Sequence, residues 1–275
     1  MFEPTFIPQL QKFPLSLADV QFYVERNNRF IDPSDPTIEG THIHEYTELI
    51  VYVQGAMSFF VNGQLYDLQK GDIVVSKPNT MHVGLFQKAE NYEYFCVWID
   101  ADENSPLLLF LKNMRSAILS FDEQTREKIY ALLLSVANES NTSPLQKTAD
   151  FLQFLSILQR SPTRKKSQNP LPPQMQAVLN DIHNNAADIA HAQDLCTRHF
   201  LSHATLDRWF KRYLHISPRA FLEAEKLAFA SRLLASGANV TDACMQSGFS
   251  DCSYFIAIFK KKFGETPLQY KRKFH

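Results

Sequence analysis

Cysteine, glycine and long hydrophobic runs are all scarce in this chain. Its 275 residues include four cysteines and eight glycines. No two cysteines form a CxxC pair, which argues against a disulfide framework and for a reducing compartment. No apolar run approaches the roughly 18 residues that a membrane span requires. The first 15 residues lack the basic stretch and apolar stretch of a secretory signal. We therefore expect a cytoplasmic protein without a membrane segment.

A large excess of one charge is also missing, because the net charge is −1. Hydrophobic residues make up 45% and charged residues 21% of a length that suits two globular domains. Residues 1–173 carry 15 basic and 20 acidic side chains, or −5, whereas residues 174–275 carry 13 and 9, or +4. The basic C-terminal part is compatible with attraction to nucleic-acid phosphates.

Short strands separated by turn residues are expected from about 38 to 99. Asn62-Gly63, between two apolar runs, is a strong signal for a two-residue hairpin. Several short strands at regular spacing predict a sandwich or a small barrel. The expected strands, rich in β-branched and aromatic residues, are 48–53, 58–68, 72–76 and 92–99.

Histidines and one carboxylate form a cluster of candidate ligands in this segment. His42 and His44 are two residues apart, so their side chains point to the same face of a strand. Glu48 follows four residues after His44, and we expect His82 to lie across the barrel. Three histidines and a carboxylate are a normal ligand set for a first-row metal ion. The same groups could instead line a polar barrel mouth that contacts one small molecule.

The spacing of these residues resembles the cupin superfamily. Its two motifs are matched by His42-x-His44-x3-Glu48-x6-Gly55 and by Gly71-Asp72-x5-Pro78-x3-His82. In cupin enzymes, three histidines and a glutamate at these positions hold a metal. Asn79-Thr80-Met81 lacks the glycine that those enzymes carry after the proline. The segment is therefore more similar to the cupin-like sensor domains of bacterial regulators, which often keep histidines without a metal. The resemblance implies no resident metal and a ligand-binding set of His42, His44, Tyr46, Glu48 and His82.

Helices are predicted between residues 106 and 160, where the strand pattern ends. Asp122 and Ser143 are expected N-caps, and Pro144 suits the first helical position. Phe151 and Phe154 belong to an apolar stripe that could pack against the barrel, form a dimer interface, or do both. The polar, basic and proline-rich residues 161–173 are expected to form a linker between two domains.

The remaining residues, 174–275, contain a repeat at an offset of 49 residues. The two copies read Ser202-x3-Leu206-x3-Phe210-Lys211-x5-Ser217-Pro218 and Asp251-x3-Phe255-x3-Phe259-Lys260-x5-Thr266-Pro267. Each starts with a cap residue, which is followed by apolar residues one helical turn apart. His215 stands where the second copy has Gly264. The repeat predicts two helix-turn-helix units joined by an amphipathic helix at 220–237.

This pattern, together with Gly248-Phe249 before the second copy, resembles the DNA-binding domain of the AraC/XylS transcription regulators from about 182 to 274. The resemblance implies that two reading helices enter successive segments of the major groove. The residues it assigns to the first reader are His203, Ala204, Asp207, Arg208, Lys211 and Arg212. Those it assigns to the second reader are Cys252, Ser253, Ile256, Ala257 and Lys260.

The two readers differ in their chemistry. Arg208 is the best candidate base reader, because its guanidinium can pair with guanine O6 and N7. Lys211, Arg212 and Lys260 are better placed for phosphates. In the second reader, Ile256 and Ala257 offer no side-chain hydrogen-bond donor. We therefore expect that reader to depend on DNA shape and thymine-methyl contacts.

Together these observations predict two domains and a regulatory function. Residues 1–160 are expected to form an all-β cupin-like barrel followed by helices, and residues 174–275 an all-α double helix-turn-helix domain. We predict a transcription regulator, by resemblance an activator, and not an enzyme. A small molecule such as a sugar would control it through the middle helices and the linker. Its other partners would be double-stranded DNA, RNA polymerase and a second copy of the chain.

Two alternatives remain open at this point. The first is a metal-dependent cupin enzyme fused to a DNA-binding module, in which His42, His44, Glu48 and His82 hold the metal. The second is a regulator that a partner protein controls without any small ligand.

Overall fold

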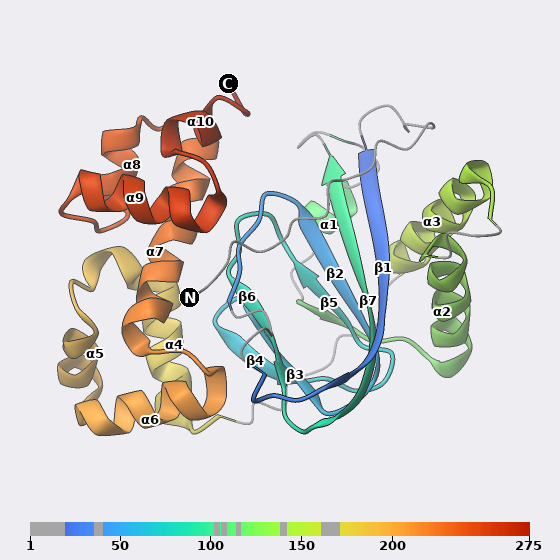
Figure 1. Ribbon diagram of the computed structural model, residues 1–275, viewed down its shortest axis with the longest axis horizontal. Coiled ribbons are helices and arrows are strands. Elements are labelled where there is room, and N and C mark those ends of the chain that lie inside the picture. Colours follow the sequence, from blue (N-terminus) through green and yellow to red (C-terminus); the bar gives the residue numbers. More distant parts are fainter. Residues whose placement is uncertain are drawn as a thin grey trace.

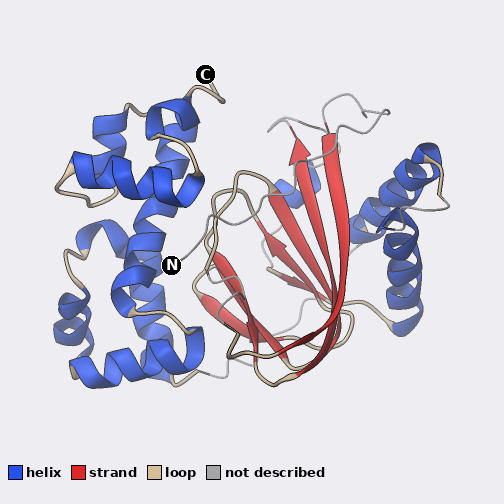
Figure 2. Cartoon of the chain, viewed as in Figure 1, coloured by secondary structure: helices blue, strands red, loops and turns tan. Residues whose placement is uncertain are grey.

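The computed structural model describes residues 20–35, 41–101, 105, 109–113, 117–137, 142–160 and 171–275. Strands occupy the first part of the chain and helices the second (Figures 1 and 2), which confirms the predicted fold class. Residues 161–170 of the expected linker lie outside the described residues. In the described part of the chain, no helix combines the length and hydrophobicity that a membrane crossing requires.

The larger sheet has five strands, and all of its neighbouring strands are antiparallel. In spatial order they are β1 Val20–Ile31, β7 Glu90–Ala101, β2 Thr47–Gln54, β5 Ile73–Ser76 and β8 Ile118–Leu119. β1 and β8 lie outside the segment from about 38 to 99 where strands were expected, and the strand at His82–Phe86 of the smaller sheet was not among the four that were named. Residues 20–24 of β1 alternate between buried and less buried positions, but none of residues 25–30 is buried, so the alternating hydrophobic signal covers only half of the strand. It is recruited by pairing with β7 along its full length.

The smaller sheet contains β4 Gln64–Asp67, β3 Met57–Val61 and β6 His82–Phe86. Asn62 and Gly63 join β3 to β4 with φ values of 51° and 73°, which confirms the predicted hairpin turn. The described strands thus form two separate sheets and not one closed ring of hydrogen bonds. An isolated bridge between His42 and His82 adds one further strand-like contact at the edge of the smaller sheet.

The larger sheet is covered on its outer side by α2 Glu123–Ala137 and α3 Pro144–Gln159 (Figure 1). Phe151 of α3 stacks on Phe22 of β1 with ring centroids 3.7 Å apart. Ser143 caps α3 by accepting a hydrogen bond from the Gln146 N–H, as predicted. The apolar stripe of these helices therefore packs on the sheet. A short helix, α1 Leu109–Asn113, precedes them.

In the described C-terminal residues, 171–275, all regular secondary structure is helical. These are α4 Pro173–Asn185, the 3₁₀ turn η1 Ala186–Asp188, α5 Ala192–His199, α6 His203–Leu214, α7 Pro218–Ala235, α8 Val240–Gln246, α9 Cys252–Phe263 and α10 Pro267–Lys271. Two helix-turn-helix units, α5–α6 and α8–α9, are joined by the long helix α7 (Figure 1). The predicted repeat and its connecting helix are present.

Matching caps begin the repeated helices. Ser202 accepts from the Thr205 N–H at the start of α6, and Asp251 accepts from the N–H groups of Ser253 and Tyr254 at the start of α9. The ends also match, because His215 and Gly264 both adopt left-handed backbone, with φ of 52° and 78°. Both α6 and α9 therefore end in left-handed backbone, although the residue that follows α6 is not glycine.

Gly248, which follows α8, cannot be replaced by a residue with a side chain, unlike the glycine position that His215 fills in the first copy. It has φ 80°, and a Cβ atom there would lie 2.3 Å from the Ala187 carbonyl oxygen. The close approach of two backbones, in addition to the left-handed conformation, requires glycine. Gly248 of the Gly248-Phe249 pair therefore allows the turn after α8 to pack closely against the backbone of Ala187.

Candidate functional site

Four side chains predicted to form a ligand site converge on one carboxylate oxygen. Glu48 is on β2 and His82 on β6, while His42 and His44 lie in the segment that leads into β2. The Oε2 atom of Glu48 lies 2.8 Å from Nε2 of His82 and 3.6 Å from Nε2 of both His42 and His44. All four candidate ligand atoms lie within 4.8 Å of one another. We call these four residues the histidine cluster.

Burial and charge strongly perturb the cluster. Burial alone would raise the pKa of Glu48, but the three neighbouring imidazoles hold it well below its ordinary value. The pKa of His82 falls to about 4, because the residue is buried and faces the other imidazoles, although Glu48 opposes this shift. At neutral pH, the site therefore contains a buried carboxylate and a neutral His82.

Backbone carbonyls determine which ring nitrogen of two histidines carries the proton. Nδ1 of His44 lies 2.9 Å from the Tyr46 carbonyl oxygen, and Nδ1 of His82 lies 2.8 Å from that of Thr80. A carbonyl only accepts, so each Nδ1 donates, and the Nε2 of a neutral ring is left with a lone pair. Both Nε2 atoms face Glu48, and the 2.8 Å contact between His82 Nε2 and Glu48 Oε2 requires a proton or a cation between these two acceptors. His44 Nε2 is buried without a hydrogen-bond partner among the described residues.

This arrangement fits a divalent cation, because a carboxylate and two imidazole lone pairs are all electron donors. Histidine ligands typically donate their second nitrogen to a backbone carbonyl or carboxylate. Ligand atoms about 2.1 Å from a shared ion lie roughly 3 Å from each other, comparable with the 2.8 and 3.6 Å separations around Glu48. The four residues of the cluster would be the ligands, and such an ion would supply a Lewis-acidic centre for an oxygen-bearing molecule.

Tyr46, the fifth predicted pocket residue, lies beside the cluster. Its ring stacks on His44, with centroids 4.0 Å apart and planes at an angle of 8°. Its carbonyl orients the same histidine. The structure therefore brings all five predicted pocket residues together.

Two residues that the sequence analysis did not select hold the cluster in place. Thr80 provides the carbonyl that orients His82. Asn79 adopts left-handed backbone with φ 57°, and its N–H donates to the His44 carbonyl oxygen at 2.8 Å. Asparagine tolerates this conformation better than most residues, so it can serve where cupin enzymes have glycine. An asparagine at the position of the cupin glycine was the feature of the sequence from which this left-handed turn could have been predicted.

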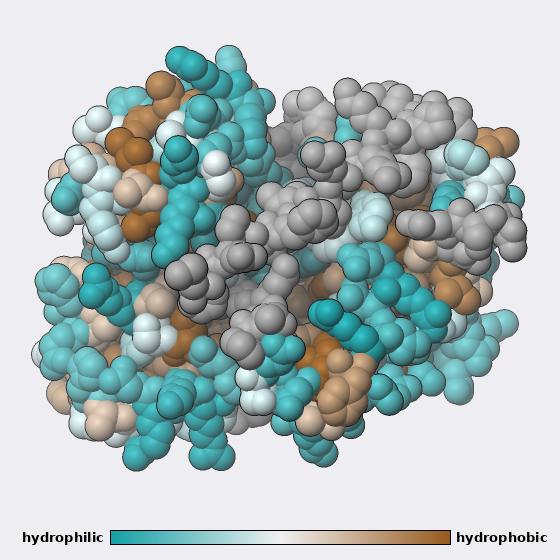
Figure 3. Space-filling model, viewed as in Figure 1, coloured by the Kyte–Doolittle hydropathy of each residue, from teal (hydrophilic) through white to brown (hydrophobic). Residues whose placement is uncertain are grey.

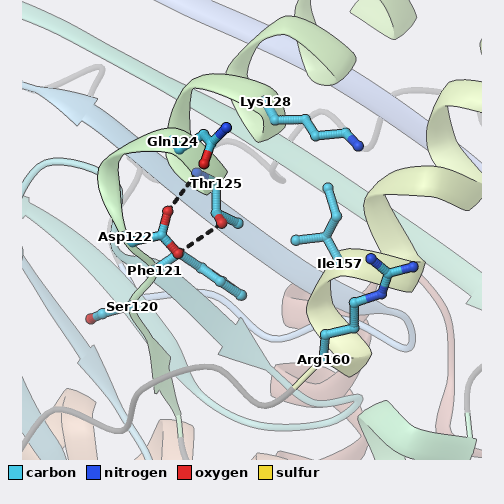
Figure 4. A pocket seen from close by; sticks show the side chains of 8 residues that line it. All are labelled: Ser120, Phe121, Asp122, Gln124, Thr125, Lys128, Ile157 and Arg160. Atoms are coloured by element: carbon cyan, nitrogen blue, oxygen red, sulfur yellow. Dashed lines mark hydrogen bonds between the residues drawn. The ribbon is translucent and has the colours of Figure 1, made fainter.

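A hollow of about 520 Å³ lies between α2 and α3, away from the histidine cluster (Figure 4). Lys128 of α2 and Arg160, at the end of α3, contribute to its lining. Asp122, at its edge, is occupied in capping α2 through the N–H and hydroxyl of Thr125. None of the five predicted pocket residues lines this hollow.

The outer faces of α6 and α9 carry the predicted DNA contacts. All six residues assigned to the first reader are exposed. Among them, His203 and Asp207 pair with each other at 2.8 Å. In the second reader, Ser253, Ile256, Ala257 and Lys260 are exposed. In the view of Figure 3, hydrophobic side chains gather over the region of α8 and α9, while the region of α6 is mainly hydrophilic.

Cys252 differs from the other residues assigned to the second reader. It is only half-exposed, and its Sγ atom lies 2.8 Å from Sγ of Cys244, which is buried in α8. Burial and the neighbouring thiol raise the pKa of Cys244 to about 12. The Cys252 side chain is therefore directed towards the helix-turn-helix core more than towards the outer face.

Comparisons with known proteins agree with both halves of this description. Residues 33–200 match a family described as an AraC-like ligand binding domain, and residues 195–273 match one described as a helix-turn-helix domain. The chain is 23% identical over 266 residues to the HTH-type transcriptional activator RhaS of Escherichia coli K12, covering 91% of this chain and 95% of RhaS.

Solved structures of similar proteins cover the chain in whole or in part. ToxT from Vibrio cholerae is 18% identical, with a TM-score of 0.38, over 92% of this chain and 98% of ToxT. The C-terminal domain of the response regulator yesN from Fusobacterium nucleatum is 28% identical, with a TM-score of 0.33, over 35% of this chain and 95% of that domain.

Proposed function

Because the chain belongs to the AraC family of transcription regulators, we propose that it activates transcription from specific DNA sites under the control of a small molecule. The observation that carries the proposal is the joint match of a ligand-binding domain and a helix-turn-helix domain, which together span residues 33–273. RhaS, a relative over nearly the whole length, is named an activator. Like its relatives, the chain is a transcription regulator and not an enzyme.

DNA is read by α6 and α9 in this proposal. Arg208 would contact a guanine, while Lys211, Arg212 and Lys260 would contact phosphates. The connecting helix α7 has 18 residues and is therefore roughly 27 Å long. A rigid spacer of that size suits two readers on successive major-groove segments of one face of the duplex.

The effector would bind at the histidine cluster and Tyr46. Imidazole and carboxylate groups can hydrogen-bond hydroxyl groups, and an aromatic ring can stack on the apolar face of a sugar ring. These features make a sugar one reasonable effector class. RNA polymerase and a second copy of the chain are the other partners of an activator of this kind, and we place its action in the cytoplasm, where the DNA is.

The test is a selection from random DNA with the full-length protein, repeated with members of a sugar library. We expect enrichment of two half-sites about one helical turn apart. We also expect one class of sugar to raise the thermal unfolding temperature and change DNA affinity. Absence of any enriched sequence would contradict the regulator. Enrichment without any sugar effect would contradict only the effector class.

A second candidate, a regulator that responds to a divalent cation, is favoured by one observation. The Nε2 atoms of His44 and His82 face a buried carboxylate while their Nδ1 atoms donate to carbonyls, and a cation would satisfy all three groups. Elemental analysis of protein purified without chelators measures this directly. About one equivalent of Fe, Mn, Zn or another first-row ion, lost in His44→Ala but kept in His199→Ala, would support it. His199 is a matched control because it pairs with Asp181 outside the cluster.

A further inference from the structure

The two helix-turn-helix units are attached to the N-terminal domain in different ways. The first shares one hydrophobic core with the smaller sheet: Phe60 and Leu65 of that sheet lie in a cluster with Phe210 of α6 and Phe221 of α7. The rings of Phe60 and Phe221 meet edge to face at 5.3 Å. The second unit has its own core around Phe255, Phe259 and Tyr270 that includes no described residue of the sheets. Its partly buried Phe263 packs against both cores.

Polar contacts join the second unit, with the adjoining end of α7, to the N-terminal domain. Among the described residues, these contacts involve the two segments that carry the histidine cluster, residues 41–48 and 77–82. The contacts are Lys262 Nζ to the Thr41 carbonyl at 2.5 Å, Lys273 Nζ to Glu45 Oε1 at 2.9 Å, Arg232 Nη1 to the Asn79 carbonyl at 2.8 Å, and the Tyr270 hydroxyl to Asn79 Oδ1 at 2.7 Å.

Asn79 is bonded to both sides of this interface. Its N–H donates to the His44 carbonyl, its own carbonyl accepts from Arg232 of α7, and its side-chain oxygen accepts from Tyr270 of α10. It is 6% exposed and held in left-handed backbone. A buried residue bonded at three points cannot shift without breaking at least one of these bonds, and each broken bond costs free energy.

The histidine cluster lies next to Asn79 in the chain and in space. Thr80, the following residue, orients His82, and the His44 carbonyl accepts from Asn79 itself. On the other side, the Tyr270 ring packs against Phe259 and Phe263 of α9, with centroids 5.4 and 5.3 Å away. Asn79 and its hydrogen bond to Tyr270 therefore connect the candidate effector site to the second reading helix.

We propose that Asn79 is the positioning residue through which the occupancy of the histidine cluster controls the second helix-turn-helix unit, while the first unit stays fixed on the smaller sheet. This inference rests on the proposed function. Polar contacts can be exchanged for water at a small net change in free energy, whereas separating the first unit would expose a shared apolar core. An occupant that moves His44 or His82 changes the second reader's position relative to the first, and thus which half-site spacing the protein accepts.

This route differs from the expected one through the middle helices and the linker. The helices α2 and α3 lie on the outer side of the larger sheet, away from the C-terminal helices (Figure 1). The contacts of Asn79 cross directly between the two domains. Neither α2 nor α3 takes part in them.

Amide hydrogen exchange of the full-length protein, without DNA or effector, tests the attachment. Asn79→Gly permits the left-handed backbone and removes the acceptor for Tyr270, and Tyr270→Phe removes the donor while keeping the ring. We expect either change to speed exchange in residues 252–271 about fivefold or more, in the range of typical coupling between sites, and to leave residues 203–214 unchanged. Equal effects on both units, or none, would overturn the proposal.

Glu48→Gln tests transmission from the cluster. It should alter exchange in residues 252–271 in the wild-type background, and this effect should disappear in Asn79→Gly. Tyr130→Phe is the matched control, because it removes a hydroxyl hydrogen bond to Glu93 on the α2 side of the larger sheet. An undiminished Glu48→Gln effect in Asn79→Gly would assign the transmission elsewhere and overturn the role of Asn79. Neither result depends on the random-DNA selection, so failure of the proposed function would be seen separately there.

Discussion

Phe200 and His215 follow α5 and α6 in left-handed backbone, with φ of 53° and 52°. Such a conformation is unfavourable for a residue with a Cβ atom. His215 occupies a position where the second copy of the repeat has Gly264. Phe200 is 94% exposed, so its ring gains no burial that would offset the backbone strain.

Phe200→Gly should therefore stabilise the protein. We expect the free energy of unfolding to rise by about 1 kcal/mol, because glycine adopts positive φ without the strain that phenylalanine suffers. Urea denaturation of the two proteins measures the difference. As a control, Lys261→Gly at an exposed position of α9 should lower stability by about 1 kcal/mol. A lower stability of Phe200→Gly would show that the ring has a partner in solution.

Arg208 and Lys211 should make different contributions to DNA binding. Both are exposed on α6, but a guanidinium can read a base pair and an amine mainly neutralises a phosphate. We expect Arg208→Ala to lose about 1–3 kcal/mol of discrimination at one base pair, and Lys211→Ala to weaken all sequences alike and reduce the salt slope by about 1. Fluorescence anisotropy against a set of single-base variants measures both. Uniform weakening by Arg208→Ala would contradict its role as a base reader.

At the scale of single elements, the last turn of α9 contains a lysine that is partly withdrawn from water. Burial lowers the pKa of Lys262 to about 8, although the Glu223 carboxylate partly opposes this. Its amine donates to the Thr41 carbonyl of the N-terminal domain. The same helix is anchored by Phe255 and Phe259, which are fully buried. The buried phenylalanines therefore hold α9 in the core of the second unit, and the titratable Lys262 adds a contact with the N-terminal domain.

The stability contribution of Lys262 should depend on pH. Its pKa is about 8 in the folded chain and about 10.4 in an unfolded chain. Between these values the unfolded chain binds more protons, so the free energy of unfolding rises with pH. We expect wild-type stability, measured relative to Lys262→Met, to increase from about pH 8 to about pH 10.4 and to be lowest below that range. A pH-independent difference between the two proteins would contradict the shifted pKa.

At the scale of the whole molecule, the apolar faces of α2 and α3 are covered by packing on the larger sheet. Leu145 of α3 is an exception, with 68% of its surface exposed. If these helices also form the proposed dimer, Leu145 belongs to the surface that remains for it. Burying a leucine is worth roughly 1.5–3 kcal/mol, and a symmetric interface would contain it twice.

We expect Leu145→Glu to shift the protein from dimer to monomer in sedimentation velocity, because it would place a charge in that apolar contact. The matched control is Lys147→Glu, which changes charge on the same helix at a half-exposed position. A wild-type monomer at micromolar concentration would contradict the dimer. A dimer that Leu145→Glu leaves intact would place the interface elsewhere.

Local features of the fold were predictable because they depend on residues close together in the chain. The caps Ser143, Ser202 and Asp251, the Asn62-Gly63 turn and the helical repeat all follow from spacings of a few residues. The ligand cluster was also predictable, because its motif spacing resembles a known family. β1 and the division into two sheets were not, because they depend on pairing between strands distant in sequence.

The sequence by itself therefore determined the order of the main elements, the two helix-turn-helix units and the residues that meet at the candidate effector site. Only the tertiary structure decided that Asn79 joins that site to the second unit, through partners 153 and 191 residues away. It also decided that Cys252 turns inward to Cys244. Helix and turn signals act over one or two turns of chain, whereas these contacts exist only once the elements have folded and packed against each other.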